Sequence, residues 1–126
     1  MRTTLLRYLA AAAFCGLAGA PAEAQVDKTQ REGIRNLARI DSTVACAGAI
    51  TPAAIAAIKA DGYGAIINLR LATEPGADID VHTAAAKTAG IRYIHIPFSA
   101  AAPDPAAVDQ FLKTITSPGV EPAFIH

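Results

Sequence analysis

The chain has 126 residues, of which 52% are hydrophobic, 17% charged and 6% aromatic. This apolar share excludes a disordered or collagen-like chain, and the length suits a single globular domain. Eleven basic residues balance eleven acidic residues. The chain therefore has no net charge that would attract nucleic acid or an anionic membrane, and we expect neither as a partner.

Residues 1–24 have the pattern of a secretory signal peptide. A basic start (residues 1–7) precedes an uncharged apolar run (residues 8–20), and Ala22 and Ala24 stand at the A-x-A spacing of a cleavage site. A membrane anchor is the alternative, but the run is shorter than the ~20 apolar residues of a spanning helix. The bulky residue before Cys15 argues against a lipoprotein signal. We expect cleavage after Ala24, a periplasmic or secreted mature protein, and no stable membrane association after signal removal.

The next segment, residues 25–42, mixes polar and charged residues, and we interpret it as a lead-in with weak helix or loop character. The predicted domain covers residues 43–126 and starts with a short strand over residues 43–47. Cys46 lies in this strand and is the one cysteine left after signal removal. We interpret it as a small buried hydrophobe rather than a nucleophile.

A helix is predicted to start at Thr51, as N-cap, with Pro52 at its first position, and to end at Gly62. Residues 65–69 form a near-continuous apolar run. Such a run is typical of a strand covered on both faces, as in a parallel sheet.

The alternation then repeats. Residues 78–89 predict a second helix, residues 91–96 a strand, and Asp104 with Pro105 the start of a third helix. Apolar residues recur on one face of this last helix at helical spacing. They are Val108, Phe111, Leu112 and Ile115. A strand over residues 122–126 follows, so we predict an α/β fold with a mostly parallel sheet and flanking helices.

The sequence given stops at His126, on the carboxyl end of the last predicted strand. Ligand-binding loops of α/β sheets normally follow such strand ends. We therefore expect a C-terminally incomplete domain, which further residues or another chain would complete.

Several motifs carry a resemblance to a known family. They are Ala47-Gly48 with Thr51-Pro52, GAIINLR at residues 64–70 with Glu74, GIRYIHIP at residues 90–97, and AFIH at residues 123–126. Over about residues 34–126 the chain resembles the N-terminal part of the phosphatase-like domain of bacterial beta-lactamase hydrolase-like proteins. That family belongs to the cysteine-dependent tyrosine and dual-specificity phosphatase superfamily.

The resemblance implies hydrolysis of phosphate monoesters through a Cys-phosphate intermediate, without a cofactor. It implies that His126 corresponds to the family His that directly precedes the nucleophile Cys. A loop ending in Arg follows that Cys, holds the phosphate and stabilises the thiolate. The sequence given ends before this loop, so we expect this chain alone to be inactive. The implied partner is a phosphorylated substrate of unknown identity.

Three further residues are candidates for the site. Asp104 follows the HIP motif and is a candidate general acid, although an Asp before Pro is also a good helix N-cap. Arg70 and Glu74 stand at and after a strand's carboxyl end, where they would orient the catalytic loop or form only a surface ion pair. The three histidines are far apart in sequence and lack metal-ligand spacing, so we expect no metal site.

Two other functions stay open at this stage. One is a non-catalytic periplasmic module that binds a partner or an anion. The other is sulfur transfer of the rhodanese kind, which also places a catalytic Cys in a loop after a parallel strand. The coding sequence after the His126 codon would separate these alternatives from a phosphatase.

Overall fold

The computed structural model describes residues 26–126, and the predicted signal peptide, residues 1–24, lies outside them. The described part contains six strands and three helices. In chain order they are β1 (Asp27–Arg31), β2 (Ile34–Arg39), β3 (Val44–Cys46), α1 (Ala54–Ala60), β4 (Ala65–Asn68), α2 (Ile79–Ala89), β5 (Arg92–His95), α3 (Pro105–Ile115) and β6 (Ala123–Ile125). No helix among these residues is long and apolar enough to cross a membrane.

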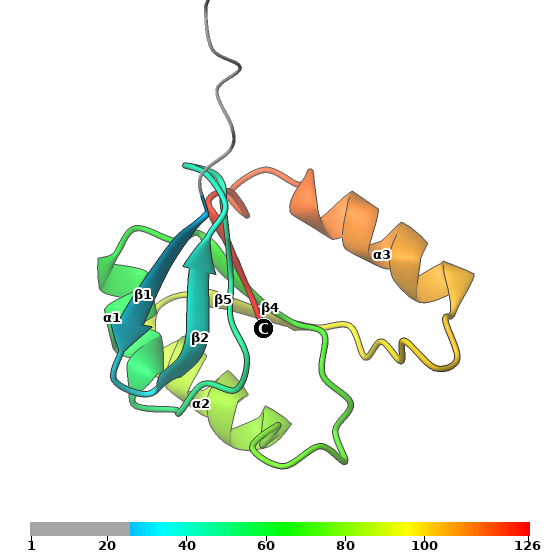
Figure 1. Cartoon of the computed structure of the whole chain (residues 1–126), viewed down its shortest axis with the longest axis horizontal. Coiled ribbons are helices and arrows are strands. Elements are labelled where there is room, and N and C mark those ends of the chain that lie inside the picture. The colour runs from blue at the N-terminus through cyan, green and yellow to red at the C-terminus, as the bar shows by residue number, and fades with distance from the viewer. Residues whose placement is uncertain (1–25) are drawn as a thin grey trace, which may run out of the picture.

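The strands form one sheet in the order β1-β2-β3-β6-β4-β5. The strands β3, β6, β4 and β5 are parallel to one another. At one edge of the sheet, β2 pairs antiparallel with β3, and β1 pairs antiparallel with β2. Figure 1 shows α1 and α2 on one side of this sheet and α3 on the other. The α/β fold with a mostly parallel sheet is therefore confirmed.

The interpretation of residues 25–42 as a helical or looped lead-in was wrong, because most of the segment forms the β1–β2 hairpin. Ile34 and Leu37 of β2 are buried at 6% and 3% exposure. Residues three apart in a regular strand point to opposite faces. Both can be buried here because Asn36, between them, has a positive φ of 52° that interrupts the alternation. Because of this spacing, the sequence of β2 lacks the alternation of apolar and polar residues by which a half-buried strand is recognised.

The first helix starts later than predicted. It begins at Ala54 with Ala53 as N-cap and without a side-chain cap, so Thr51 does not cap it. Instead the main-chain N–H of Thr51 donates to Gly33 O at 2.8 Å, which ties this segment to the hairpin. The other two helix boundaries are confirmed: α2 ends at Gly90, in the left-handed region at φ 71°, and Asp104 caps α3.

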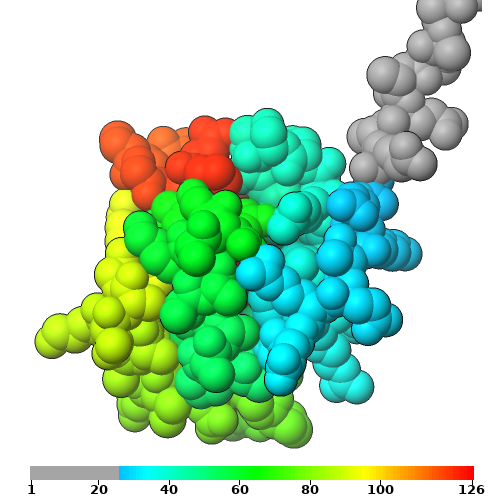
Figure 2. Space-filling model, turned by 90° about the vertical axis from the view of Figure 1, so that its left-hand side faces the viewer, coloured from blue at the N-terminus to red at the C-terminus, as the bar shows by residue number. Residues whose placement is uncertain are grey.

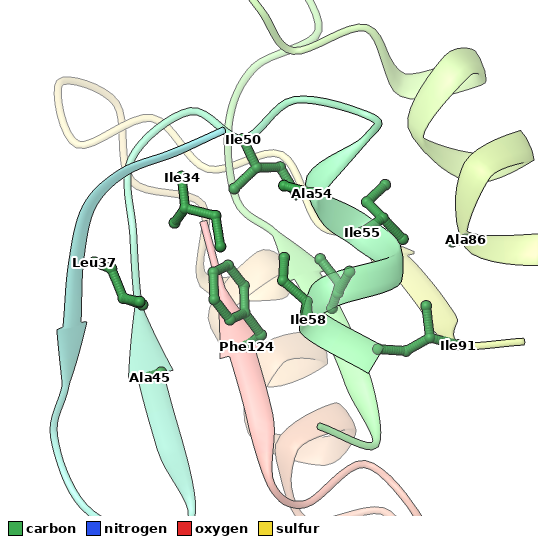
Figure 3. Close-up of a cluster of buried hydrophobic side chains, with 11 residues drawn as sticks. Ile34, Leu37, Ala45, Ile50, Ala54, Ile55, Ile58, Ala86, Ile91 and Phe124 are labelled. Carbon is green, nitrogen blue, oxygen red and sulfur yellow. The ribbon is translucent and has the colours of Figure 1, made fainter. Parts of the chain in front are cut away.

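The core has two parts, one on each face of the sheet. On the face covered by α1 and α2, Phe124 lies among the side chains of Ile34, Leu37 and Ile58 (Figure 3). Figure 2 views the molecule from this side, with α1 between the hairpin, in blue and cyan, and α2. The smaller cluster on the α3 side includes Ile67, Ile96 and Val120. All four residues of β4 are buried, which confirms a strand covered on both faces.

The apolar stripe predicted on α3 is only partly buried. Val108 and Leu112 are 42% and 54% exposed, and the buried residue of the helix is Ala107. An apolar groove of about 190 Å³ lies between α3 and the sheet. It is lined by Leu69, Ile96, Phe98, Ala107, Val108 and Phe111. The helix thus uses its small residue for close packing, and the described residues leave half of the stripe uncovered.

Candidate functional site

Polar side chains gather at the carboxyl ends of β4, β5 and β6. Strand alternation puts Asn68 on the same face as Ile66, and the parallel register aligns these two residues with His95 and Tyr93 of β5. His126 follows β6 on that face as well, two residues after Phe124. The face is therefore apolar where the strands start and polar where they end, under α1 and α2.

His126 is 5% exposed and continues the sheet beyond β6. Its N–H donates to Ile67 O at 2.9 Å, and its carbonyl accepts the N–H of Leu69 at 2.7 Å. The ring Nε2 lies 3.4 Å from the Tyr93 hydroxyl, while the buried Nδ1 has no partner among the described residues. Burial, with a smaller contribution from the charges of His82, Arg70 and His95, lowers the pKa of His126 from 6.5 to about 4. The ring is therefore neutral at pH 7.

Asn68 and Tyr93 form a short hydrogen-bonded series with the main chain. Asn68 is fully buried; its Oδ1 accepts the main-chain N–H of Arg70 at 2.8 Å, and its Nδ2 donates to the Tyr93 hydroxyl at 2.8 Å. Burial raises the pKa of Tyr93, an effect that the bond from Asn68 partly offsets. The hydroxyl thus keeps its proton at neutral pH.

The structure brings Arg70 and Glu74 together, as their sequence positions implied. Arg70 Nη2 lies 3.3 Å from Glu74 Oε2 and donates to Pro75 O at 2.9 Å, while Glu74 Oε1 accepts the N–H of Leu71. The side chains are 20% and 40% exposed, so this is a partly exposed ion pair. Arg70 Nε is buried and has no partner among the described residues, whereas the main-chain carbonyl of Arg70 accepts His95 Nε2 at 2.8 Å.

His82 of α2 joins this site, which the sequence interpretation missed. It is 1% exposed, and its ring centroid lies 5.9 Å from those of Tyr93 and His126. Its Nδ1 and Nε2 face the carbonyls of Ala77 and Ile50 at 3.2 and 3.1 Å. Sequence distance hid this proximity, since no local pattern links α2 to the end of β6. Among residues 26–126 no group of three or more His, Cys, Asp or Glu side chains is arranged to hold a metal ion.

Asp104 and Cys46 lie outside this polar site. The carboxylate of Asp104 accepts the N–H of Ala106 at 2.9 Å, so it caps α3 as its position before Pro105 suggested. Cys46 is a half-buried residue of β3, aligned with Ile125 of β6. Burial raises the pKa of the Cys46 thiol. This disfavours the thiolate that a nucleophilic cysteine needs.

Comparison with known protein families gives a match over most of the described chain. The model of the beta-lactamase hydrolase-like protein, phosphatase-like domain, matches residues 33–122. The chain belongs to this phosphatase-like family. The resemblance seen in the sequence motifs is therefore confirmed. No curated protein sequence matches the chain.

Solved structures with the same fold include a DUF442 protein of Shewanella putrefaciens CN-32, described as a candidate phosphatase, with a TM-score of 0.67 and 22% identity. The match covers 75% of this chain and 59% of that one. A candidate phosphatase of Neisseria meningitidis Z2491 has a TM-score of 0.59 at 21% identity, covering 69% and 63%. P. aeruginosa TpbA has a TM-score of 0.60 at 17% identity, covering 85% and 61%. The chain thus spans about three-fifths of the length of these structures.

Proposed function

We propose that the protein is an exported hydrolase of phosphate monoesters that works through a Cys-phosphate intermediate. In this proposal the nucleophile loop directly follows His126. The observation that carries it is a pair of buried nitrogen atoms without partners among the described residues, Arg70 Nε and His126 Nδ1. Both lie just beyond the carboxyl ends of the central strands β4 and β6. The membership of the family supports the same reaction class.

The position of β6 in the sheet supports a loop at this place. β6 lies between β3 and β4, so a loop that follows it starts at the middle of the carboxyl edge. Its main-chain N–H groups and a terminal Arg would hold the phosphate while the thiolate attacks phosphorus and the leaving oxygen departs. Arg70, fixed by Pro75 and Glu74, would support this loop from β4.

The leaving oxygen needs a proton donor, for which Asp104 is the candidate that the sequence offers. In the structure its carboxylate is engaged as the cap of α3. The two roles are separable, because Asp104→Asn keeps an oxygen that accepts the Ala106 N–H but removes the acidic proton. A general acid predicts a loss of the basic limb of the pH–rate profile in this variant, whereas a cap alone predicts an unchanged profile.

The first experiment reads the coding sequence after the His126 codon. A Cys codon, five further codons and an Arg codon are the expected result, and a stop codon there would overturn the proposal. A stop codon would favour the non-catalytic binding module instead.

The second experiment compares turnover of a generic aryl phosphate by the 126-residue chain and by the product of the longer frame. We expect activity in the longer product alone, and its loss on changing the loop Cys to Ser, because nucleophile and anion cradle act as a unit. Turnover by the 126-residue chain that survives Cys46→Ser would show that the active site lies elsewhere. Sulfur transfer from thiosulfate without phosphate hydrolysis would favour the rhodanese alternative.

A further inference from the structure

His82 of α2 lies between two buried carbonyl groups. Its Nδ1 is 3.2 Å from Ala77 O, and its Nε2 is 3.1 Å from Ile50 O. None of the three residues is more than 4% exposed. Neither carbonyl accepts a main-chain N–H of the described residues. Since a buried carbonyl needs a donor, the ring of His82 is the donor that the described part of the chain offers to both.

The number of protons on the ring decides how many of these bonds form. A main-chain carbonyl oxygen only accepts, so each nitrogen of His82 needs a proton to bond to the carbonyl in front of it. A neutral imidazole has one proton and bonds to one carbonyl, while the lone pair of its other nitrogen faces an oxygen atom. The imidazolium has two protons and bonds to both carbonyls.

The two carbonyls belong to different loops at the carboxyl edge of the sheet. Ile50 lies in the loop from β3 to α1 (residues 47–53), and Ala77 lies in the loop from β4 to α2 (residues 69–78). In the sheet, β3 and β4 flank β6 on either side. The bridge through His82 therefore joins the loops of the two strands that border the end of β6.

The loop from β4 to α2 connects this bridge to Arg70. Its Gly76 packs against the other loop, since a methyl group at this position would lie 3.7 Å from Ala49 Cβ. The next residue, Ala77, donates its N–H to Glu74 O at 3.0 Å, and the Glu74 carboxylate lies 3.3 Å from Arg70 Nη2. Holding Ala77 in place therefore restrains Glu74 and, through it, the guanidinium group of Arg70.

We propose that His82 is a positioning residue that acts as a proton-dependent clamp between these two loops. With a proton on both nitrogens it bonds to Ile50 O and Ala77 O, and so fixes the loop that carries Arg70. With one proton it releases one of the two carbonyls. That Arg70 serves phosphate hydrolysis rests on the proposed function, whereas the clamp depends only on the contacts of the ring.

The surroundings of His82 act on its second proton in opposite directions. Tyr93 of β5 and His126 of β6 are the titratable side chains beside it, each with a ring centroid 5.9 Å away. The charges of Arg70 and His95 act on His126 in the same pocket. Burial beside these groups opposes a second proton, whereas the two carbonyl dipoles favour it, so the state of the clamp depends on pH. The charged residues at the start of α2 and within α1 and α2 are all exposed: Lys59, Asp78, Asp80 and Lys87.

The test is NMR spectroscopy of the 126-residue protein over the pH range in which it stays folded. The ¹⁵N signals of the imidazole groups report the protons on His82. Hydrogen exchange, corrected for its intrinsic pH dependence, reports the order of the loop through the amides of Leu71 and Ala77, which both bond to Glu74. We expect both nitrogens of His82 to be protonated at the acidic end of the range. When one proton is lost, the protection factors of the two amides should fall by roughly ten-fold, as for the loss of one hydrogen bond.

Two variants complete the test. His82→Gln removes the titrating ring but keeps an amide that donates to one carbonyl, so the protection factors of Leu71 and Ala77 should be low and independent of this titration. Lys87→Gln is the matched control, because it introduces the same side chain and removes a cation at an exposed position of α2. It should behave as the wild type.

Two results in the wild type would overturn the inference, and neither requires that a variant folds. The first is a His82 ring that keeps a single proton over the whole range. The second is a set of loop protection factors that do not follow the titration of His82.

Activity measurements separate the clamp from the proposed function. In the product of the longer reading frame, His82→Gln should remove a pH-dependent step in kcat for an aryl phosphate, while Lys87→Gln keeps it. Because the clamp acts through Arg70, His82→Gln should change the profile no further in an Arg70→Lys background. A further change of the same size would show that His82 acts through His126 and would overturn its role in positioning Arg70. If no product hydrolyses phosphate but the NMR results are as expected, the clamp stands and the proposed function is wrong.

Discussion

Acidification is expected to destabilise the protein through His126. Burial is the main cause that lowers the pKa of this ring from 6.5 to about 4 in the folded state. Between these two pKa values the unfolded chain binds a proton at His126 that the folded chain excludes. The contribution of His126 to the free energy of unfolding is therefore complete above pH 6.5 and is lost as the pH falls towards 4. Each pH unit within this window costs up to ~1.4 kcal/mol, and the whole window about 3 kcal/mol.

Urea unfolding, followed by far-UV circular dichroism at a series of pH values, measures this loss. The comparison is with His126→Gln, which removes the titrating ring and should flatten the fall in unfolding free energy. Leu112→Gln places the same side chain at an exposed position of α3 and should keep the wild-type slope. The difference between the slopes isolates His126, because the remaining groups titrate in all three proteins. Parallel curves for the wild type and His126→Gln would refute the reasoning.

Three further outcomes are expected. Phe124→Ala should cost about 3–5 kcal/mol in unfolding free energy, since the ring is 1% exposed and packs edge-on against Tyr63 at 5.4 Å; a loss below 1 kcal/mol by urea titration would contradict this packing. Asp104→Ala should cost about 1 kcal/mol by the same titration, through loss of the α3 cap, while Asp104→Asn should cost less. N-terminal sequencing of exported material should give Gln25 as the first residue, and a soluble cytoplasmic product that retains Met1 would disprove the export proposal.

Local chemistry made several elements predictable from the sequence. The apolar run of β4, the left-handed Gly90 and the Asp104 cap act over a few residues, and each appears in the structure as expected. Long-range effects explain the errors. The hairpin depends on the burial of Ile34 against the rest of the core, and the late start of α1 depends on the bond between Thr51 and Gly33.

The same distinction applies to the site. Arg70 and Glu74 lie four residues apart, and their ion pair is a local event that sequence position could indicate. Asn68 stood within a recognised motif but had no assigned role, because its partner Tyr93 comes from the next strand. His82 reaches the site only through the packing of α2 on the sheet. Nothing in the local sequence around His82 indicates this contact.

The place of β6 also has a consequence for how the chain folds. Val44 and Ala65 both pair with Ala123, so two early strands are joined only by the last strand in chain order. Such non-local pairing delays folding, because the entropy of closing long loops is lost before the contacts form. During synthesis, β3 and β4 would leave the ribosome with a vacant place between them. Chaperones that bind exposed apolar strands are expected to bind the nascent chain before β6 is made. A pulse-labelling experiment should detect protection of the β4 amides that bond to β6, as distinct from those that bond to β5, only after residue 125 has emerged.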